Sequence, residues 1–344
     1  NEKGCQISYY DDSMEEPDTM MASSNNYLIP LVLGYFKDRW VFGKEAKRLA
    51  VVGEDCTETD LYGKAKRREK VSLAGKTYDA VWLLAKYISL TLQDFENIQY
   101  LTFTTPETDV DMAKMLKGIG QHIGVDKEII NVQDYKESFC QYMIFQPKEL
   151  WQYESALFYC DEDRIKAYML RRLRVDASHG MNSFVTVDEV ANAQRKELEA
   201  LYPIMNKEKS PDESFKSMIE NVFEKKVISS VYLTGEGFEK NWYPNSLRVL
   251  CNGRRAFMGN NLYSKGACYK SIRKCEPNDD GPIYLDETKL TERICLRMRV
   301  DGQEGWYPLV TWGTHWYEAD GQWEVLLEDA SDIEILVESL VDEE

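Results

Sequence analysis

Residues 231–272 restrict the possible folds of this 344-residue chain more than any other stretch. An apolar run ends at Thr234, and a turn with two glycines, residues 235–237, follows it directly. Two glycines after a strand allow positive φ and a close approach of the backbone to another group. Two helical segments come next, the first with Pro244 near its start and the second with Gly266 where helices pack closely. This order predicts an α/β domain, in which the amide-rich start of the first helix suits an anion.

The first half of the chain shows alternating strand and helix patterns. Apolar residues at helical spacing predict a helix over residues 78–92, after an N-terminal β-meander. A strand at 100–103, a helix begun by Thr105 and Pro106 and ended by Gly118 or Gly120, and a strand at 128–132 follow, with a further helix over 137–145. Strand, helix and strand joined by short connections indicate parallel pairing.

A second such unit begins at residue 156. Its first strand pairs with residues 165–173 across the acidic turn of residues 161–163, and the spacing beyond it predicts a helix over 187–201. Ser210-Pro211-Asp212-Glu213 is a capping box that begins an amphipathic helix. The apolar residues at 227–234 then predict a buried strand.

Composition excludes several classes of protein. The eight cysteines are scattered with no C-x-x-C pair, and there are three histidines, so we expect no metal site and reduced cysteines. No apolar run of 18 residues is present, and the first residues do not resemble a signal peptide. These features predict a cytoplasmic protein that does not insert into membranes.

Charge is concentrated at the C-terminal end. The net charge is −17, and residues 276–344 hold four Lys/Arg against 19 Asp/Glu. Such an end repels phosphate backbones, so we expect no nucleic-acid binding, and the charge serves either solubility or a basic partner. Four strand-like segments, with Asp301-Gly302 and Asp320-Gly321 as hairpin turns, predict a small β-rich domain. Its tryptophans and tyrosines are expected to form the domain core, with a peptide or glycan surface as the alternative, and His315 is expected to be structural.

The block at 231–272 resembles the adenosine-binding segment of the actin, sugar-kinase and heat-shock-chaperone superfamily, most closely its DnaK-type chaperones, and is similar to a bacterial family of such proteins. There a strand ends in a glycine pair over the nucleotide, and a later helix carries a small-residue motif like Gly266-Ala267. Residues 23–49, with the G-x-x-A-K motif that starts at Gly43, resemble the early hairpin of these chaperones. Residues 100–119 resemble the strand, proline and helix of their first lobe, and residues 135–145 the helix that crosses between the lobes.

The resemblance implies two actin-like, ribonuclease H-like lobes at residues 1–155 and 156–275, followed by an acidic β-rich domain at 276–344. It also implies ATP or ADP with magnesium as ligand. The residues expected to bind the nucleotide are Lys3, Gly4, Asp161, Thr234, Gly235, Glu236, Gly237, Phe238 and Gly266.

The departures from the family bear on activity. The first phosphate loop of the family follows a strand that lies before Asn1 or is missing, and the second is replaced by Asp161-Glu162-Asp163, which contains no glycine. Only residues 54–70 and 176–210 are left for the inserts that clamp adenine. Carboxylates repel a triphosphate unless a divalent metal lies between them. We therefore expect no catalytic residues.

Three functions fit the resemblance. The first is a degenerate ATPase that acts as a protein-binding or chaperone-like module through its C-terminal β domain. The second is an active ATP-dependent chaperone whose first strand lies outside this sequence, and the third is an actin-like structural or filament protein.

Overall fold

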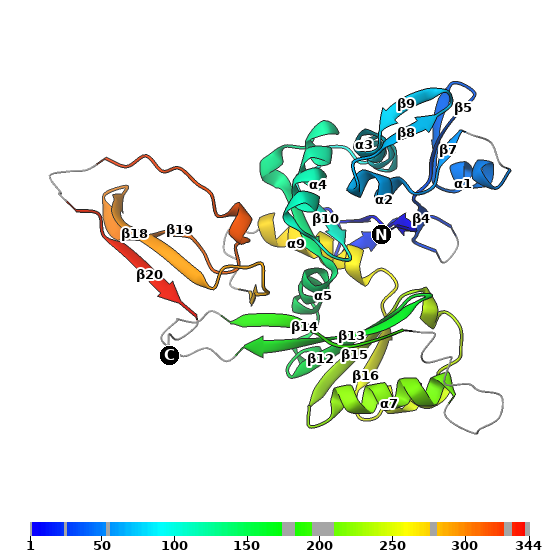
Figure 1. The fold of residues 1–344 in the computed structure, drawn as a ribbon. Helices are drawn as coiled ribbons and strands as arrows, with labels where there is room; N and C mark the ends of the chain where they lie inside the picture. Colours follow the sequence, from blue (N-terminus) through cyan, green and yellow to red (C-terminus); the bar gives the residue numbers. More distant parts are fainter. Residues whose placement is uncertain are drawn as a thin grey trace. The chain divides into compact units, whose positions relative to one another are not determined.

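The computed structural model describes residues 2–23, 26–52, 56–173, 183–194, 210–275, 281–326 and 332–340. The chain forms a mixed α/β fold with a β-rich C-terminal region (Figure 1). It divides into two compact units, Asn1–Phe145 with Gly259–Asp279, and Gln146–Met258 with Asp280–Glu344. Both units are therefore discontinuous in sequence, whereas the domains expected from the sequence were continuous. In the described residues, no helix is both long and apolar enough to cross a membrane.

The first unit combines short β ladders with helices. Lys37 and Asp38 have positive φ at the turn between two of its strands, as expected for a tight hairpin. The elements before residue 100 are β1 (Gly4–Cys5), β2 (Ser8–Tyr9), β3 (Asp18–Thr19), β4 (Ile29–Pro30), β5 (Leu33–Phe36), β6 (Arg39–Phe42), α1 (Gly43–Val52), β7 (Thr57–Glu58), α2 (Leu61–Lys66), β8 (Lys70–Leu73), β9 (Lys76–Asp79) and α3 (Ala80–Thr91). Helix α3 confirms the helix predicted at 78–92, and Asp79 caps it through the amides of Val81 and Trp82.

A parallel strand pair completes the first unit. Strands β10 (Leu101–Thr105) and β11 (Ile130–Asp134) run parallel and are joined by α4 (Val110–His122), which confirms the predicted pairing. Helix α4 begins at Val110 under an Asp109 cap, so the start predicted at Thr105 was wrong. The Thr105 hydroxyl instead bonds the carbonyl of Glu107 and the hydroxyl of Thr108. Helix α4 also continues through both predicted stop glycines. Helices α5 (Tyr135–Ile144) and α9 (Leu262–Cys275) pack on this pair.

The second unit is built on a six-stranded sheet of order β16-β15-β12-β13-β14-β17. Figure 1 shows α7 lying along one face of this sheet. The helix predicted at 187–201 was wrong up to residue 194, because this stretch pairs with β13 along its whole length as a strand. Residues 195–201 lie outside the described part. The elements are β12 (Glu154–Cys160), β13 (Arg164–Leu173), β14 (Phe184–Gln194), α7 (Pro211–Phe223), β15 (Ile228–Thr234), α8 (Pro244–Leu250), β16 (Arg255–Met258) and β17 (Ile283–Tyr284).

The core of this sheet joins strands to helix α7. Ser210 caps α7 by accepting the Glu213 amide at 3.2 Å, which confirms the predicted start of the helix. The Glu213 side chain accepts from Asn245 instead of closing the capping box on Ser210. Phe215, Ile219 and Val222 then bury one face of α7 against apolar side chains of β12, β13 and β15. The helical spacing of these apolar residues therefore predicted the buried face of α7 correctly.

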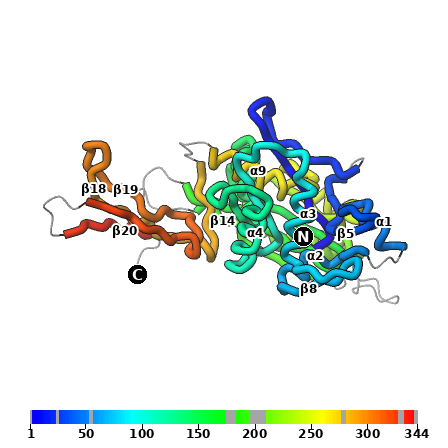
Figure 2. Tube along the Cα trace, turned by 90° about the horizontal axis from the view of Figure 1, so that it is seen from above, coloured from blue at the N-terminus to red at the C-terminus, as the bar shows by residue number. Residues whose placement is uncertain are grey.

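A three-stranded antiparallel sheet of order β19-β18-β20 forms the C-terminal region, and its strands run side by side in Figure 2. Its strands are β18 (Glu292–Val300), β19 (Gln303–Val310) and β20 (Ile335–Ser339). The predicted hairpin turn at Asp301-Gly302 is confirmed, with positive φ at both residues. Residues 323–326 form no strand, so the strand predicted there was wrong in its described part, and Asp320-Gly321 joins no hairpin.

The aromatic residues of this region do not form the expected core. Trp312 is buried against Phe184, whereas Trp306, Trp316 and Trp323 are exposed. A three-stranded sheet offers too little inner surface to bury so many large rings. His315 lies between Thr288 and Lys289, with its Nδ1 2.9 Å from the Thr288 hydroxyl and its Nε2 2.8 Å from Lys289 Nζ.

Candidate functional site

The glycine turn lies at the shared carboxyl edge of two parallel strands. Strands β12 and β15 pair in register up to Tyr159 and Thr234, so the chain leaves both strands at the same edge of the sheet. Gly235 follows with φ +99°, and a Cβ at this position would lie 2.1 Å from the carbonyl oxygen of Cys160. The turn therefore needs glycine at 235 both for its backbone angle and for its contact with β12.

Gly237 is required for space alone. Its φ is not positive, contrary to the expectation that both glycines would adopt such angles. A Cβ at 237 would lie 2.3 Å from Cys160 Sγ and 2.9 Å from the Asp161 carbonyl oxygen. Glu236–Phe238 forms a single 3-10 turn between these contacts. The result is a backbone turn packed directly onto the end of β12.

The acidic turn beside Cys160 satisfies its own backbone. One carboxylate oxygen of Asp161 accepts hydrogen bonds from the amides of Asp163 and Arg164, each at 2.7 Å. The Asp161 amide in turn donates to the carbonyl of Arg164 at 3.1 Å. In a phosphate-binding loop, backbone amides such as these point at the phosphate oxygens. Here a side-chain carboxylate of the same turn occupies two of them.

The carboxylates at this edge of the sheet influence the pKa of Tyr159. Burial raises the pKa of the Tyr159 phenol above its ordinary value, and the nearby carboxylates of Asp161 and Glu236 raise it further. Both effects keep the phenol protonated and uncharged. The local field at the end of β12 and β15 therefore disfavours any added negative charge.

The helix start that suits an anion is also occupied. The Asp212 carboxylate, at the second position of α7, accepts from the amides of Asn245 and Ser246 at 2.8 Å each and from the Ser246 hydroxyl at 2.6 Å. Asp212 thus fills the position that the sequence suggested for a bound anion at the start of α8. This carboxylate lies 33 residues from its partners, and its role was not foreseen.

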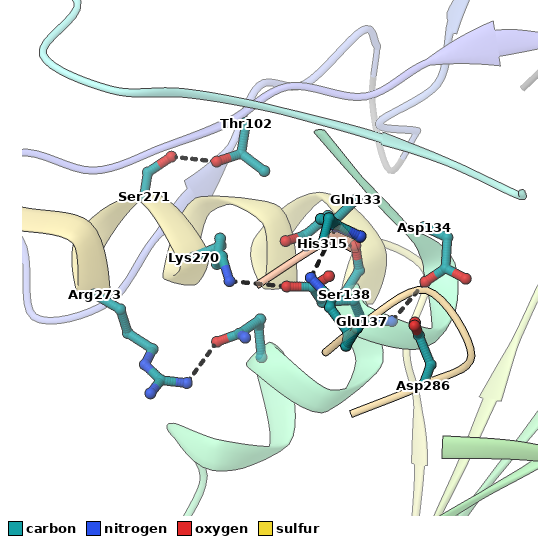
Figure 3. Close-up of polar contacts among 12 residues, drawn as sticks. Thr102, Gln133, Asp134, Glu137, Ser138, Lys270, Ser271, Arg273, Asp286 and His315 are labelled. Atoms are coloured by element: carbon teal, nitrogen blue, oxygen red, sulfur yellow. Dashed lines mark hydrogen bonds and ion pairs between the residues drawn. The ribbon is translucent and has the colours of Figure 1, made fainter. Parts of the chain in front are cut away.

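The first unit contains a second buried polar cluster, on α5 and α9. In Figure 3, Lys270 reaches from α9 to Glu137 on α5. Arg273, on the same helix, donates to the side chain of Gln141 at 3.1 Å. The distance from Lys270 Nζ to Glu137 Oε1 is 2.8 Å, and the Glu137 side chain is 3% exposed. This is a desolvated ion pair, which requires good geometry to be tolerated.

Ser138 joins this cluster to the strand ends. Its hydroxyl lies 2.6 Å from the Thr104 hydroxyl and accepts from the Gln133 side-chain amide at 2.8 Å. A Cβ added to Gly266 would lie 1.9 Å from the carbonyl oxygen of Ser138, so the backbones of α5 and α9 are in direct contact. Sequence reasoning found Gly266 but missed Lys270. The signal for Lys270 was its position one helical turn beyond Gly266, on the same face.

The predicted nucleotide-binding residues divide between the two units. Asp161, Thr234, Gly235, Glu236, Gly237 and Phe238 belong to the second unit, and Lys3, Gly4 and Gly266 to the first. Phe238 is buried in the core, where its ring lies parallel to that of Trp242. Gly4 is buried against Ile29, and Lys3 accepts a bond from the Leu31 amide. The nucleotide-binding role of all nine residues stays a prediction.

Two places where backbone amides could contact a phosphate are already bonded within the protein. Across residues 2–340, outside the undescribed gaps, no group of three or more His, Cys, Asp or Glu side chains is placed to hold a metal ion. The turn amides of Asp163 and Arg164 and the amides at the start of α8 are already bonded to carboxylates. A phosphate would have to displace a side chain of the protein at either place.

Comparison with protein families matches two successive segments of the chain. A family model described as "Family of unknown function (DUF5716) C-terminal" matches residues 16–287, which include both polar clusters. The chain belongs to the DUF5716 family. A second model, "Domain of unknown function (DUF8552)", matches residues 289–344 and so covers β18, β19 and β20. None of the curated proteins matches the chain. The DUF5716 segment thus ends between β17 and β18, before the C-terminal sheet begins.

Proposed function

We propose that this DUF5716 protein is a divergent relative of the actin, sugar-kinase and heat-shock-chaperone superfamily. In this proposal it is a degenerate ATPase that acts as a protein-binding or chaperone-like module. The fold, the nucleotide site and the partner binding are each part of the proposal, and different observations support them.

The sheet of the second unit supports the relationship. Strand β12 is followed by two antiparallel neighbours, β13 and β14, and the chain then crosses through α7 to β15, which is parallel to β12 on its other side. Strand β16 follows α8 and is parallel to β15. A parallel strand pair reached through a helix is the α/β arrangement that the resemblance implies, and the glycine turn lies at the edge where ligands of α/β sheets bind.

The helices of the first unit also support it. The chain passes from the first unit to the second directly after α5, and it returns directly before α9. These are the two segments that resemble the crossing helix and the small-residue helix of the chaperones. Their contact at Gly266 and Ser138 gives the glycine a packing role of the kind that the resemblance implies.

The hydrogen bonds of Asp161 are the observation that supports the proposed lack of ATPase activity. Its carboxylate holds the amides of Asp163 and Arg164, in the turn that would be the second phosphate loop. Phosphoryl transfer depends on donors and a metal aimed at the phosphates. This turn presents three carboxylates, and two of its amides are already bonded to one of them. It therefore supplies neither donors nor a metal aimed at the phosphates. We therefore assign a binding role to this protein rather than a catalytic one.

An ATP titration of the full chain tests this assignment. In the presence of magnesium, we expect calorimetry to show weak or no binding and hydrolysis to equal the blank without protein. Asp161→Gly removes one charge and frees both amides, so we expect ATP affinity to rise at least about threefold. Glu220→Gln is the matched control, because it removes an exposed charge on α7 and leaves the turn intact. Sustained ATP turnover by the unaltered chain would overturn the assignment and favour an active chaperone.

A further inference from the structure

Strand β20 is a free edge of the C-terminal sheet. It pairs with β18 on one side, and no described strand pairs with its other side. The Arg297 amide donates to the Glu334 carbonyl at 3.1 Å, and the Leu340 amide donates to the Thr291 carbonyl at 3.0 Å. Antiparallel ladders alternate, so the backbone groups of Leu336 and Glu338 also face β18. Those of Ile335 and Val337 therefore face outward.

The opposite edge of the sheet is protected, whereas β20 is not. Strand β19 contains Pro308, which cannot donate a backbone hydrogen bond and is typical of edges that resist further pairing. Strand β20 has the sequence Ile-Leu-Val-Glu-Ser and contains no proline, lysine or arginine. An added strand would therefore find acceptors and donors on β20 rather than on β19.

The side chains of β20 specify the chemistry of such a strand. On one face, Arg297 of β18 bonds both Glu304 of β19 and Glu334, the residue before β20. Charges therefore alternate across the sheet and end on a carboxylate. Arg293 and Glu338 form a second row that ends in the same way. On the other face, Ile335 and Val337 are 58% and 59% exposed. The next strand would continue these rows with cations on one face and apolar side chains on the other.

Charge argues against a second copy of the chain as the occupant. Residues 316–344 contain 11 acidic residues and no lysine or arginine. Two β20 strands paired antiparallel would place Glu334 near Glu338 of the other copy, and like charges in such positions are destabilising. A cationic segment is instead attracted by the whole acidic region.

We propose that the free edge of β20 binds an extended segment of a partner protein in which lysine or arginine alternates with apolar residues. The segment adds a fourth strand, with its main chain bonded to Ile335 and Val337 and its cations beside Glu334 and Glu338. This identifies the partner chemistry for the protein-binding role proposed above and rests on that role.

Three synthetic octapeptides test the proposal against the full chain by fluorescence anisotropy. One alternates lysine with valine, one alternates glutamate with valine, and one has four lysines followed by four valines. We expect only the alternating lysine peptide to bind well, because only it places cations on one face of a strand and apolar side chains on the other. Equal binding of the two lysine peptides would reduce the interaction to bulk charge and overturn the proposal.

Two substitutions locate the interaction. Val337→Pro removes an outward amide without removing a bond to β18, so we expect binding to fall about tenfold or more while the sheet remains folded. Val337→Thr keeps the amide and is the matched control, with affinity close to that of the unaltered chain. The double substitution Glu334→Gln and Glu338→Gln is expected to weaken binding and flatten its salt dependence. Unchanged affinity in Val337→Pro would exclude this edge as the binding surface.

Hydrogen exchange gives an independent measure. The lysine peptide should slow exchange of the Ile335 and Val337 amides, whereas the amides already bonded to β18 should change little. Association of two copies through β20, seen as a dimer that Val337→Pro abolishes, would also overturn the proposal. The ATP titration is separate from these measurements, so failure of the strand interaction and failure of the nucleotide assignment are distinguishable.

Discussion

Gly266 and Ser138 touch through their backbones, because a Cβ on Gly266 would lie 1.9 Å from the Ser138 carbonyl oxygen and 2.7 Å from its carbonyl carbon. The contact holds α9 against α5 at a distance that only glycine allows. It also brings Lys270, four residues farther along α9, to the carboxylate of Glu137. The glycine and the buried ion pair are thus two parts of one helix contact.

Gly266→Ala should destabilise the protein. The methyl group must push α9 away from α5, since the atom it meets is backbone and cannot rotate aside. We expect a loss of about 2–4 kcal/mol in the free energy of unfolding. Urea denaturation followed by tryptophan fluorescence measures it.

Gly118→Ala is the control for this substitution. Gly118 lies inside α4, where an added Cβ meets nothing within 4 Å. The change should stabilise the protein by about 0.5–1 kcal/mol, because alanine favours helix over glycine. Equal effects of the two substitutions would contradict the close contact of α5 and α9.

Gly235→Ala should be more damaging than the same change at another glycine with positive φ. The added Cβ meets the Cys160 backbone and the backbone angle is also unfavourable, so we expect a loss above about 3 kcal/mol. Gly302 has φ +81° with nothing within 4 Å of its added Cβ, and Gly302→Ala should cost only about 1 kcal/mol. Comparing the melting temperatures of the two variants separates the steric clash with Cys160 from backbone strain. Similar melting temperatures would show that the Cys160 backbone moves to make room for the added Cβ.

Asp212 should make stability depend on acid pH. Burial raises the pKa of this carboxyl. The hydrogen bonds from the Ser246 hydroxyl and from the amides of Asn245 and Ser246 together lower it by more, so the pKa lies below the ordinary value of 3.8. Its contribution to stability is therefore present above the unfolded-state pKa. It is lost as the pH falls through the lower pKa of the folded protein.

Asp212→Asn should accordingly lose about 1–2 kcal/mol of stability near neutral pH, and the difference from the unaltered chain should shrink as the pH falls below 3.8. Denaturant titrations across that range measure it. Asp111→Asn removes an exposed carboxylate from the first turn of α4 and is the control. If Asp212→Asn and Asp111→Asn lose the same free energy of unfolding at every pH, the hydrogen bonds from α8 do not explain the contribution of Asp212 to stability.

Lys270→Met should destabilise the first unit by about 2–4 kcal/mol, because it leaves the buried Glu137 carboxylate without its cation. Adding Glu137→Gln to this variant should recover part of the loss, which a pure packing defect would not do. Arg67→Met breaks an exposed ion pair with Asp60 and should have a much smaller effect. Chemical denaturation of the unaltered chain, Lys270→Met, Glu137→Gln and the double variant forms a double-mutant cycle, and additivity of the two changes would contradict a coupled pair.

Short-range signals predicted many of the elements correctly. Ser210 caps its helix, Asp301-Gly302 turns its hairpin, and residues 235–237 leave the sheet after β15 as expected. Each of these depends on neighbours within a few residues, so the local sequence contains all the information needed.

Long-range pairing was the main source of error. Residues 187–194 have helical spacing, yet the hydrogen bonds of β13 hold them as a strand. The Asp212 and Lys270 interactions join residues 33 and 133 positions apart, and no local pattern specifies such distances. Tertiary context overrides local preference where a ladder or a buried charge requires a partner.

Glycine turns, capped helices and hairpins could all be located in the amino-acid sequence, as could the negative charge at the C-terminal end. The bonding of Asp161 and Asp212 to the amides an anion needs, and the exposure of Ile335 and Val337 on an edge strand, could be seen in the folded chain alone. Backbone angles are set by neighbours along the chain, whereas hydrogen-bond donors and buried surface are shared among segments that meet after folding.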